Sequence, residues 1–306
     1  MHENQNALLF LHAMTPLHPG TGTALGTVDL PVQRERHTDW PLIPGSSLKG
    51  ILRDAFRAKT ARDKNLKSLE EADRDETVKK IFGRPVKDTG APDQSGALSV
   101  TDARLLLFPV RSLRGLFALV TCPAALQRFE RDAGIGGIAI EGFEKIPKVT
   151  EDNDALVSES SPLLIPNENQ SNMVLEEFDF TAKPDHTTSS IAIWLSGKFD
   201  IPRLVDHLAI ISDDNFAYYV KHATEVSARI ALDYDTKTAE GGALFYEESI
   251  PTESVFYSLL LMNSNQNLLC KLEEMFNALK FLQIGGNSTI GKGICRAILL
   301  KGGDTK

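Results

Sequence analysis

Residues 14–57 read MTPLHPGTGTALGTVDLPVQRERHTDWPLIPGSSLKGILRDAFR, and this stretch determines how the chain is interpreted. It joins a glycine-rich loop, an isolated acid at Asp29, a basic segment and a helix. We expect the helix to begin after Pro44, with a cap from Ser46 or Ser47. Its apolar residues recur at the spacing of one helical face: they are Leu48, Ile51, Leu52, Ala55 and Phe56.

A second face of the same predicted helix is basic. Lys49, Arg53 and Arg57 recur every fourth residue, and residues four apart are neighbours on a helix surface. Arg34 and Arg36 precede the helix, so basic residues are concentrated between positions 32 and 67. A stripe of this kind suits a phosphate backbone or another anion. We therefore predict a phosphate-binding surface along this helix.

The composition describes an acidic chain that can bury a large core. It has 306 residues, of which 42% are hydrophobic, enough for one elaborated domain or two small ones. The net charge of −8 is unusual for a nucleic-acid-binding protein, because such proteins bind largely by neutralising phosphates. A basic groove on an acidic body fits this charge distribution, and so does a plain acidic enzyme.

Several features bear on the compartment. No apolar run approaches the roughly 20 residues that a membrane span needs, so we expect no membrane association. The first residues, MHENQNALLFLH, lack the basic region and cleavage site of a signal peptide. The three cysteines, Cys122, Cys270 and Cys295, show no CxxC spacing. This pattern favours a reducing cytoplasm over a disulfide framework or a zinc knuckle.

The order of the expected elements is strand, helix, strands, helix, strand, which is the order of an α+β, ferredoxin-like unit. RNA-recognition domains share this topology. Charged residues 58–95 and polar residues 150–190 interrupt the pattern, and we interpret them as insertions in a single domain spanning residues 1–306. The main expected elements are strands at 8–14, 97–107, 116–122, 191–195 and 294–300, and helices from 47, at 123–133, 202–211, 216–222 and 266–282.

Four short motifs resemble the RAMP superfamily of CRISPR proteins. They are HPGTG at 18–22, VDLPVQRERHT at 28–38, IPGSSLKG at 43–50 and IGGNSTIGKG at 284–293. More narrowly, DLPVQRERH resembles the backbone subunits of the type III-B (Cmr) effector complex. Since the motifs lie near opposite ends of the chain, the resemblance covers nearly all of it.

The resemblance implies a subunit of an RNA-guided ribonucleoprotein that cleaves the target RNA paired to its guide. It implies a ferredoxin-like (RRM-like) palm, with insertions that form fingers and a thumb hairpin. The implied partners are the CRISPR guide RNA, single-stranded target RNA, other Cmr subunits and further copies of the chain in a helical filament. A purely architectural subunit that holds the guide without cutting remains an alternative, and a nucleotide-binding enzyme is a more remote one.

Asp29 is the main catalytic candidate. An aspartate before Leu-Pro is often only a turn former, but the resemblance implies that this residue is required for target cleavage. One carboxylate can bind a divalent ion or position a nucleophile, although it cannot build a two-metal site alone. We therefore predict Asp29 as the ligand of a loosely held Mg or Mn ion. His18, in the same loop, is predicted as a second catalytic residue, with a structural role as the alternative.

Further candidates lie later in the chain. Tyr246, Glu247 and Glu248 either assist cleavage or form a solvated face. The sequence GNSTIGKG at 286–293 nearly matches the Walker A motif, which would favour a nucleotide enzyme. However, Gly293 replaces the required hydroxyl residue, and the loop precedes a strand where the motif needs to follow one. We interpret it as a loop whose amides contact guide phosphates, with a tight turn as the alternative. The predicted RNA-binding residues are thus Arg34, Arg36, Lys49, Arg53, Arg57, Gly291 and Lys292.

Overall fold

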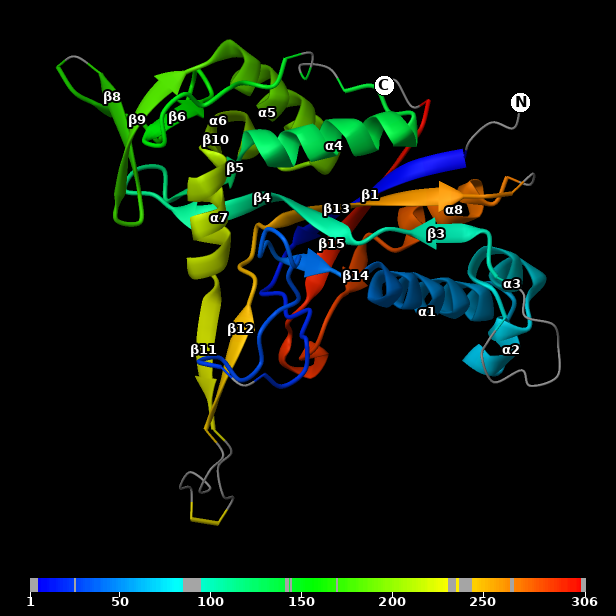
Figure 1. Cartoon of the computed structure of the whole chain (residues 1–306). Helices are drawn as coiled ribbons and strands as arrows, with labels where there is room; N and C mark the ends of the chain where they lie inside the picture. Colours follow the sequence, from blue (N-terminus) through cyan, green and yellow to red (C-terminus); the bar gives the residue numbers. More distant parts are fainter. Residues whose placement is uncertain are drawn as a thin grey trace.

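A long sheet forms the centre of the computed structural model, which describes residues 5–24, 26–84, 95–140, 143, 145–168, 170–230, 235–236, 244–264 and 267–303. The strand order is β14-β15-β1-β13-β4-β5-β10-β6-β9-β8-β7 (Figure 1). Their bounds are β1 Gln5–Ala13, β4 Ala103–Arg111, β5 Phe117–Thr121, β6 Asp154–Val157, β7 Ile165–Pro166, β8 Ser171–Leu175, β9 Phe178–Pro184, β10 Leu208–Ile210, β13 Val255–Met262, β14 Phe281–Gln283 and β15 Ile294–Lys301. Two short strands pair beside this path, β2 (Leu42–Ile43) with β4 and β3 (Leu98–Val100) with β13.

Helices cover both faces of the sheet (Figure 1). They are α1 Gly45–Asp63, α2 Leu69–Asp73, α3 Glu76–Phe82, α4 Pro123–Gly136, α5 His186–Phe199, α6 Leu204–His207, α7 Asp213–His222 and α8 Leu269–Ala278. A short 3-10 turn, Ser288–Ile290, lies in the glycine-rich segment before β15. The helices α1 and α8 pack on one face, while α4 and α5 pack on the other.

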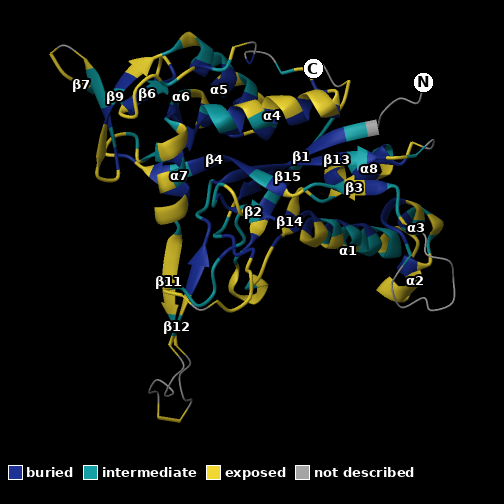
Figure 2. Ribbon diagram, in the orientation of Figure 1, coloured by how far each residue is buried: buried dark blue, intermediate teal, exposed yellow. Residues whose placement is uncertain are grey.

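Strand β1 contributes to both hydrophobic cores. It pairs with β13 on one side and β15 on the other, both antiparallel. Successive side chains of a strand point to opposite faces. Leu9 and Leu11 therefore join the core under α1, whereas Leu8 and Phe10 join the core under α4. Figure 2 shows the resulting buried centre between exposed outer helix faces.

Helix α1 confirms the predicted apolar face, because Leu48, Leu52 and Phe56 are buried. Its predicted cap is wrong. Neither serine caps the helix, and the N–H of Gly45 donates instead to Asp102 Oδ1 at 2.7 Å. A carboxylate from the segment between β3 and β4 thus satisfies the first amide of the helix.

The mixed α+β class is confirmed, with local corrections. Residues 191–195, predicted as a strand, lie inside α5, and residues 202–211 contain α6 followed by β10. The segment 150–190, interpreted as an insertion, contributes β6 to β9 to the central sheet. The segment 58–95 continues α1 and adds α2 and α3, and residues 85–94 lie outside the described residues.

A separate two-stranded sheet projects from the body (Figure 1). It consists of β11 (Glu225–Arg229) and β12 (Phe245–Ser249), which pair antiparallel directly after α7. Most of β11 is exposed, as Figure 2 shows. This hairpin lies outside both segments that we interpreted as insertions.

Within the described part of the chain, no helix has the length and apolarity required to cross a membrane.

Candidate functional site

The glycine-rich loop that contains Asp29 lies against β12. Leu30 forms a parallel bridge with Glu247, and Leu17 forms an antiparallel bridge with Ile250. The Leu30 N–H donates to the carbonyl of Tyr246 at 3.0 Å, and the Leu30 carbonyl accepts from the N–H of Glu248 at 3.0 Å. The loop therefore occupies the edge of β12 that β11 leaves open. Two segments more than 200 residues apart in the sequence build the site.

Asp29 itself is half-buried, and one of its carboxylate oxygens is fixed. Oδ2 accepts the backbone N–H of Tyr246 at 2.7 Å, and the Asp29 carbonyl accepts the N–H of Ala24 at 2.9 Å. Oδ1 accepts no hydrogen bond from a described residue. One oxygen thus orients the carboxylate, and the other is open to a substrate proton or a cation.

His18 lies inside the loop and is only 7% exposed. Its Nδ1 is 2.6 Å from the carbonyl oxygen of Glu248, and because a carbonyl only accepts, Nδ1 must carry the proton. A Cβ added at Gly20 would lie 2.6 Å from His18 Nε2, so only glycine fits against the ring. This geometry favours a structural role, and the catalytic role of His18 stays a prediction.

Glu248 connects several parts of the same loop. Its Oε1 accepts from Arg34 Nη2 at 2.5 Å, and its Oε2 accepts the N–H of Val32 at 3.0 Å. The other terminal nitrogen of Arg34 donates to the carbonyls of Asp39 and Val220. The Arg34 guanidinium is therefore used within the protein, so its predicted RNA contact would require these bonds to break. Arg36, by contrast, is exposed and forms no ion pair with a described residue.

Glu247 points to the other face of β12, where it is 2% exposed. It is held by Lys292 Nζ, by Arg229 Nη2 at 3.2 Å and by Asn287 Nδ2 at 2.7 Å. Burial raises the pKa of the Glu247 carboxyl, but hydrogen bonds from Lys292 and Arg229 outweigh burial, and the pKa is lowered overall. The ammonium of Lys292, predicted to contact a phosphate, is thus paired inside the protein.

Gly291, the other residue predicted in that loop, is exposed at a φ of 81°. This left-handed conformation favours glycine. Its N–H donates to the Ser288 carbonyl at 3.1 Å, so a bond from this amide to a phosphate would compete with the turn. The RNA contact of Gly291 stays a prediction.

The basic stripe of α1 is mostly paired with acids. Asp73 of α2 binds both Arg53 and Arg57, at 2.9 and 2.8 Å, and Arg57 also contacts Asp54 at 2.8 Å. Two of the three stripe residues therefore attach α2 to α1. Their predicted phosphate contacts compete with these bonds.

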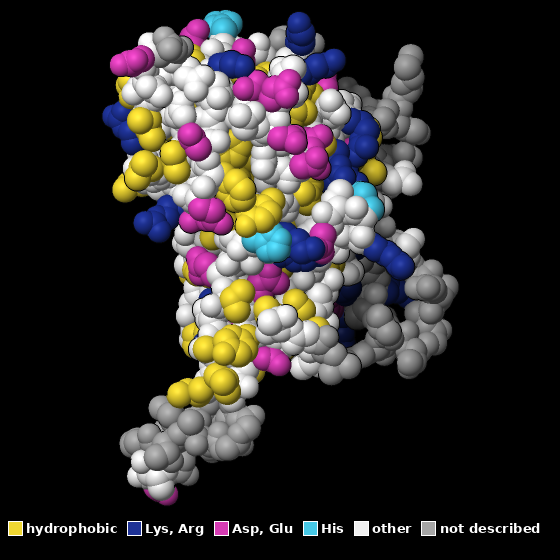
Figure 3. All heavy atoms as spheres, turned by 60° about the vertical axis from the view of Figure 1, so that its left-hand side comes forward, with side chains coloured by type: hydrophobic (Ala, Val, Ile, Leu, Met, Phe, Trp, Pro, Cys, Tyr) yellow, Lys and Arg dark blue, Asp and Glu magenta, His cyan; other side chains and the backbone are white. Residues whose placement is uncertain are grey.

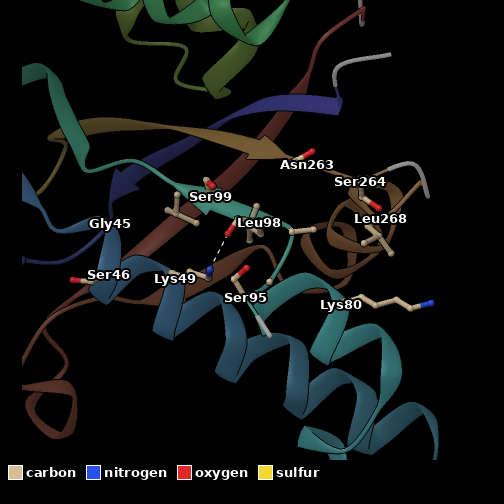
Figure 4. A pocket seen from close by; sticks show the side chains of 13 residues that line it. Gly45, Ser46, Lys49, Lys80, Ser95, Leu98, Ser99, Asn263, Ser264 and Leu268 are labelled. Carbon is tan, nitrogen blue, oxygen red and sulfur yellow. Dashed lines mark hydrogen bonds between the residues drawn. The ribbon is translucent and has the colours of Figure 1, made fainter. Parts of the chain in front are cut away.

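The third stripe residue, Lys49, lines a cavity of about 870 Å³ between α1, α3 and β3 (Figure 4). The lining contains two lysines, Lys49 and Lys80, together with four serines and Asn263, and no acidic residue. Lys49 Nζ donates to the Leu98 carbonyl at 2.8 Å, which leaves further ammonium protons. Burial, with the nearby charge of Arg53, lowers the pKa of Lys49. The cavity suits a neutral or anionic polar group.

A divalent ion would find few protein ligands here. The described residues contain no group of three His, Cys, Asp or Glu side chains that could hold a metal. Mg²⁺ often binds one or two carboxylates and takes its other ligands from substrate phosphates and water. Asp29 Oδ1 can serve as one such carboxylate ligand, but the described side chains are too few to retain an ion without the RNA.

The sequence did not reveal the residues that support the site. Asn287 belongs to a recognised motif, but the motif does not say that its side chain binds Glu247. Arg229 and Thr224, which donates to Glu248 Oε1 at 2.9 Å, lie in stretches with no pattern. Only the pairing of β11 with β12 brings them to the site.

Comparisons with known proteins agree with the motifs. The RAMP superfamily model matches residues 10–296. The Cmr endoribonuclease Cmr4 of Pyrococcus furiosus is 40% identical over 302 residues, covering 95% of each chain. The crystal structure of oligomeric Cmr4 from Pyrococcus furiosus aligns with a TM-score of 0.71 and 33% identity, over 98% of this chain and 99% of that one. A chain of the type III-B Cmr-beta complex bound to cognate target RNA shares the fold, with a TM-score of 0.69 and 20% identity over 98% of each chain. The chain therefore belongs to the RAMP superfamily.

Proposed function

We propose that this chain is the guide-RNA-binding backbone subunit of a type III-B CRISPR ribonucleoprotein and that it cleaves the paired target RNA. The relative from Pyrococcus furiosus, named a Cmr endoribonuclease, supports this reading over almost the full length. The observation that carries the catalytic part is the carboxylate of Asp29, which has one oxygen fixed by Tyr246 and one oxygen open.

A single carboxylate can assist cleavage in which the 2′-hydroxyl of the RNA itself attacks the neighbouring phosphate. Asp29 Oδ1 accepts the hydroxyl proton as O2′ forms a bond to the adjacent phosphorus. The bond from phosphorus to O5′ breaks, and the leaving oxygen takes a proton from water. The products are a 2′,3′-cyclic phosphate and a 5′-hydroxyl. Alignment of the attacking O2′ and the leaving O5′ in line with phosphorus supplies much of the reduction in the activation barrier.

We also propose that a divalent ion, when bound, stabilises negative charge on the phosphate. With an ion bound, Asp29 Oδ1 would be one of its ligands, the RNA would supply most of the others, and the 2′-hydroxyl proton would pass to water. The protein's own part is to hold the carboxylate at a fixed angle on the edge of β12.

The β11–β12 hairpin is the candidate for the thumb, and the central sheet around β1 is the candidate for the palm. Support comes from the hairpin's projection and from its exposed apolar side chains, which are Val226, Ile230, Leu244 and Tyr246. Figure 3 shows apolar side chains gathered over the described part of this hairpin, while the body above it mixes apolar, acidic and basic side chains. Apolar and aromatic side chains suit contact with bases.

Guide RNA would bind where positive or backbone groups are open. The cavity beside Lys49 and the exposed Arg36 meet this condition. The oligomeric structure of the relative from Pyrococcus furiosus supports self-association.

The test is cleavage by the reconstituted complex that carries Asp29→Asn. We expect target cleavage to disappear while guide and target binding stay within a few-fold. Asp39→Asn is the matched control. Among the described residues the Asp39 side chain pairs with Lys221 alone, and its φ of 62° is one that asparagine tolerates. Normal cleavage by the Asp29→Asn complex would reject the catalytic assignment. A wild-type complex that binds but never cuts would favour the architectural alternative.

A further inference from the structure

Strand β12 orients Asp29 through one edge, and side chains from elsewhere in the fold hold the strand through Glu247. In β12, backbone groups of Tyr246 and Glu248 face the Asp29 loop, and the intervening residue is Glu247. Glu247 is paired with Leu30, the neighbour of Asp29, in a parallel bridge. Any displacement of Glu247 along or across the strand therefore moves the amide that binds Asp29.

Glu247 is held mainly by the glycine-rich segment that precedes β15. Lys292 Nζ donates to Glu247 Oε1 and to Ser249 Oγ, the latter at 2.7 Å. Asn287 Nδ2 donates to the other Glu247 oxygen at 2.7 Å, and Arg229 of β11 adds a longer bond. Because Glu247 and Ser249 lie two apart on one strand face, Lys292 bridges successive side chains of β12.

The burial of this pair makes it sensitive to loss of a partner. Lys292 is 13% exposed at its side chain and Glu247 is 2% exposed. Removal of Lys292 would leave the buried carboxylate of Glu247 with Asn287 and the longer bond from Arg229. Losing one partner of a buried ion pair is far more costly than losing a partner of an exposed pair. The strand would shift to rehydrate the carboxylate, and the Tyr246 amide would move with it.

We propose that Lys292 is a positioning residue for cleavage, which acts by holding Glu247 and thereby the β12 edge that orients Asp29. The inference rests on the proposed function, and it replaces the phosphate contact that the sequence suggested for this lysine. Misplacement by about 1 Å at a reacting group can cost on the order of a hundredfold in rate, so a small shift of β12 is sufficient.

The experiment compares Lys292→Met, Lys292→Arg and the double variant Lys292→Met with Glu247→Gln in the assembled complex. We expect Lys292→Met to slow the single-turnover cleavage rate at least about tenfold, with guide and target affinities unchanged within about twofold. Lys292→Arg should retain most of the rate. The double variant should recover part of the loss, because the glutamine oxygen can still accept from Arg229, its amide nitrogen can donate to a turned Asn287 side-chain amide, and the buried carboxylate charge that Lys292 balanced is gone.

Lys271→Met is the matched control, since Lys271 pairs with Glu274 at the exposed surface of α8. Its rate should equal that of the wild type. Asp29→Asn, measured alongside, separates the two hypotheses: if it cuts normally, the proposed function fails, whereas an unchanged rate in Lys292→Met with an inactive Asp29→Asn overturns only this inference.

A direct phosphate contact by Lys292 predicts a different pattern. Lys292→Met would then weaken guide binding, lower the salt dependence by about 0.7 to 0.9 of a log–log unit and gain nothing from Glu247→Gln. That result would overturn the inference. If Lys292→Met does not enter the complex, Glu247→Gln alone remains decisive, because a wild-type rate in that variant would contradict the positioning role.

Discussion

The carboxylate of Asp29 and the backbone amide of Tyr246 lie 2.7 Å apart, although 217 residues separate them in the chain. Asp29, which precedes Leu-Pro as a simple turn former often does, is therefore an oriented carboxylate in the fold. Its geometry depends on two elements, the glycine-rich loop and β12, and on the side chains that hold each of them. Predictions about cleavage can consequently address the substrate, the support of the loop and the RNA-binding surface separately.

Replacing the nucleotide 5′ of one cut with its 2′-deoxy analogue should stop cleavage at that position, because the proposed mechanism takes its nucleophile from the RNA. Cuts made by other subunits should continue at their normal sites. Gel analysis of labelled target, with end-group mapping of the products, measures both effects. Normal cleavage of the deoxy site with a 5′-phosphate would instead indicate attack by water.

Asp73→Ala should destabilise the protein by about 1–3 kcal/mol, because it leaves Arg53 and Arg57 without their shared carboxylate in a partly buried site. Urea unfolding measures the change. Asp54→Ala is the control, since Asp54 also pairs with Arg57 but is 70% exposed at its side chain. Its effect should stay below about 1 kcal/mol. Equal effects for the two variants would contradict the attachment of α2 through Asp73.

Lys49→Gln should weaken RNA binding whatever the sequence and reduce the salt dependence by about 0.7 to 0.9 of a log–log unit, as expected for one lost contact with single-stranded or duplex phosphate. Lys59→Gln, on the same helix but paired with Asp63, is the control. Its binding and salt slope should match the wild type. An unchanged slope for Lys49→Gln would mean that the cavity beside α1 does not bind the backbone of the RNA.

Local sequence patterns predicted the elements that have one apolar face. The spacing of Leu48, Leu52 and Phe56 predicts α1, and all three side chains are buried. The same reasoning failed at residues 191–195, which are apolar and partly β-branched. These residues lie in α5, whose N-terminus is capped by Asp185 through the Thr188 amide at 2.7 Å. Periodicity over a short apolar run does not separate a buried helix from a strand.

The partners of charged residues could not be predicted from the sequence. The spacing of Arg53 and Arg57 in the sequence is the same whether they bind RNA or a carboxylate. Only the fold places Asp73 opposite them. Lys292 likewise lies in a motif that suggests a phosphate, but the fold places it beside Glu247 of β12. Motifs indicated which segments form the site, whereas tertiary contacts determine what each side chain binds.

With guide-like RNA, the chain should assemble into open helical oligomers. A head-to-tail contact between different surfaces of successive copies continues without closing, whereas a twofold contact stops at a dimer. Small-angle scattering and electron microscopy at increasing RNA length measure the growth. The related oligomeric structure supports this expectation. A closed dimer that is indifferent to RNA would contradict it.

The Glu247 pair should make stability depend on acid pH. Because the pKa of Glu247 is lowered in the folded protein, ionisation of this carboxyl stabilises the fold above its ordinary value of 4.5, and the contribution disappears as pH falls through the lower folded value. The free energy of unfolding of the wild type should therefore decrease below about pH 4.5. Glu247→Gln should show a shallower decrease over the same range, while Glu274→Gln, at an exposed pair on α8, should keep the wild-type slope. Some slope will remain in Glu247→Gln, since the pKa values of Glu253 and Asp75 are also lowered. Urea unfolding between pH 3 and 7 measures the curves, and identical slopes for wild type and Glu247→Gln would show that Lys292 does not hold an ionised Glu247.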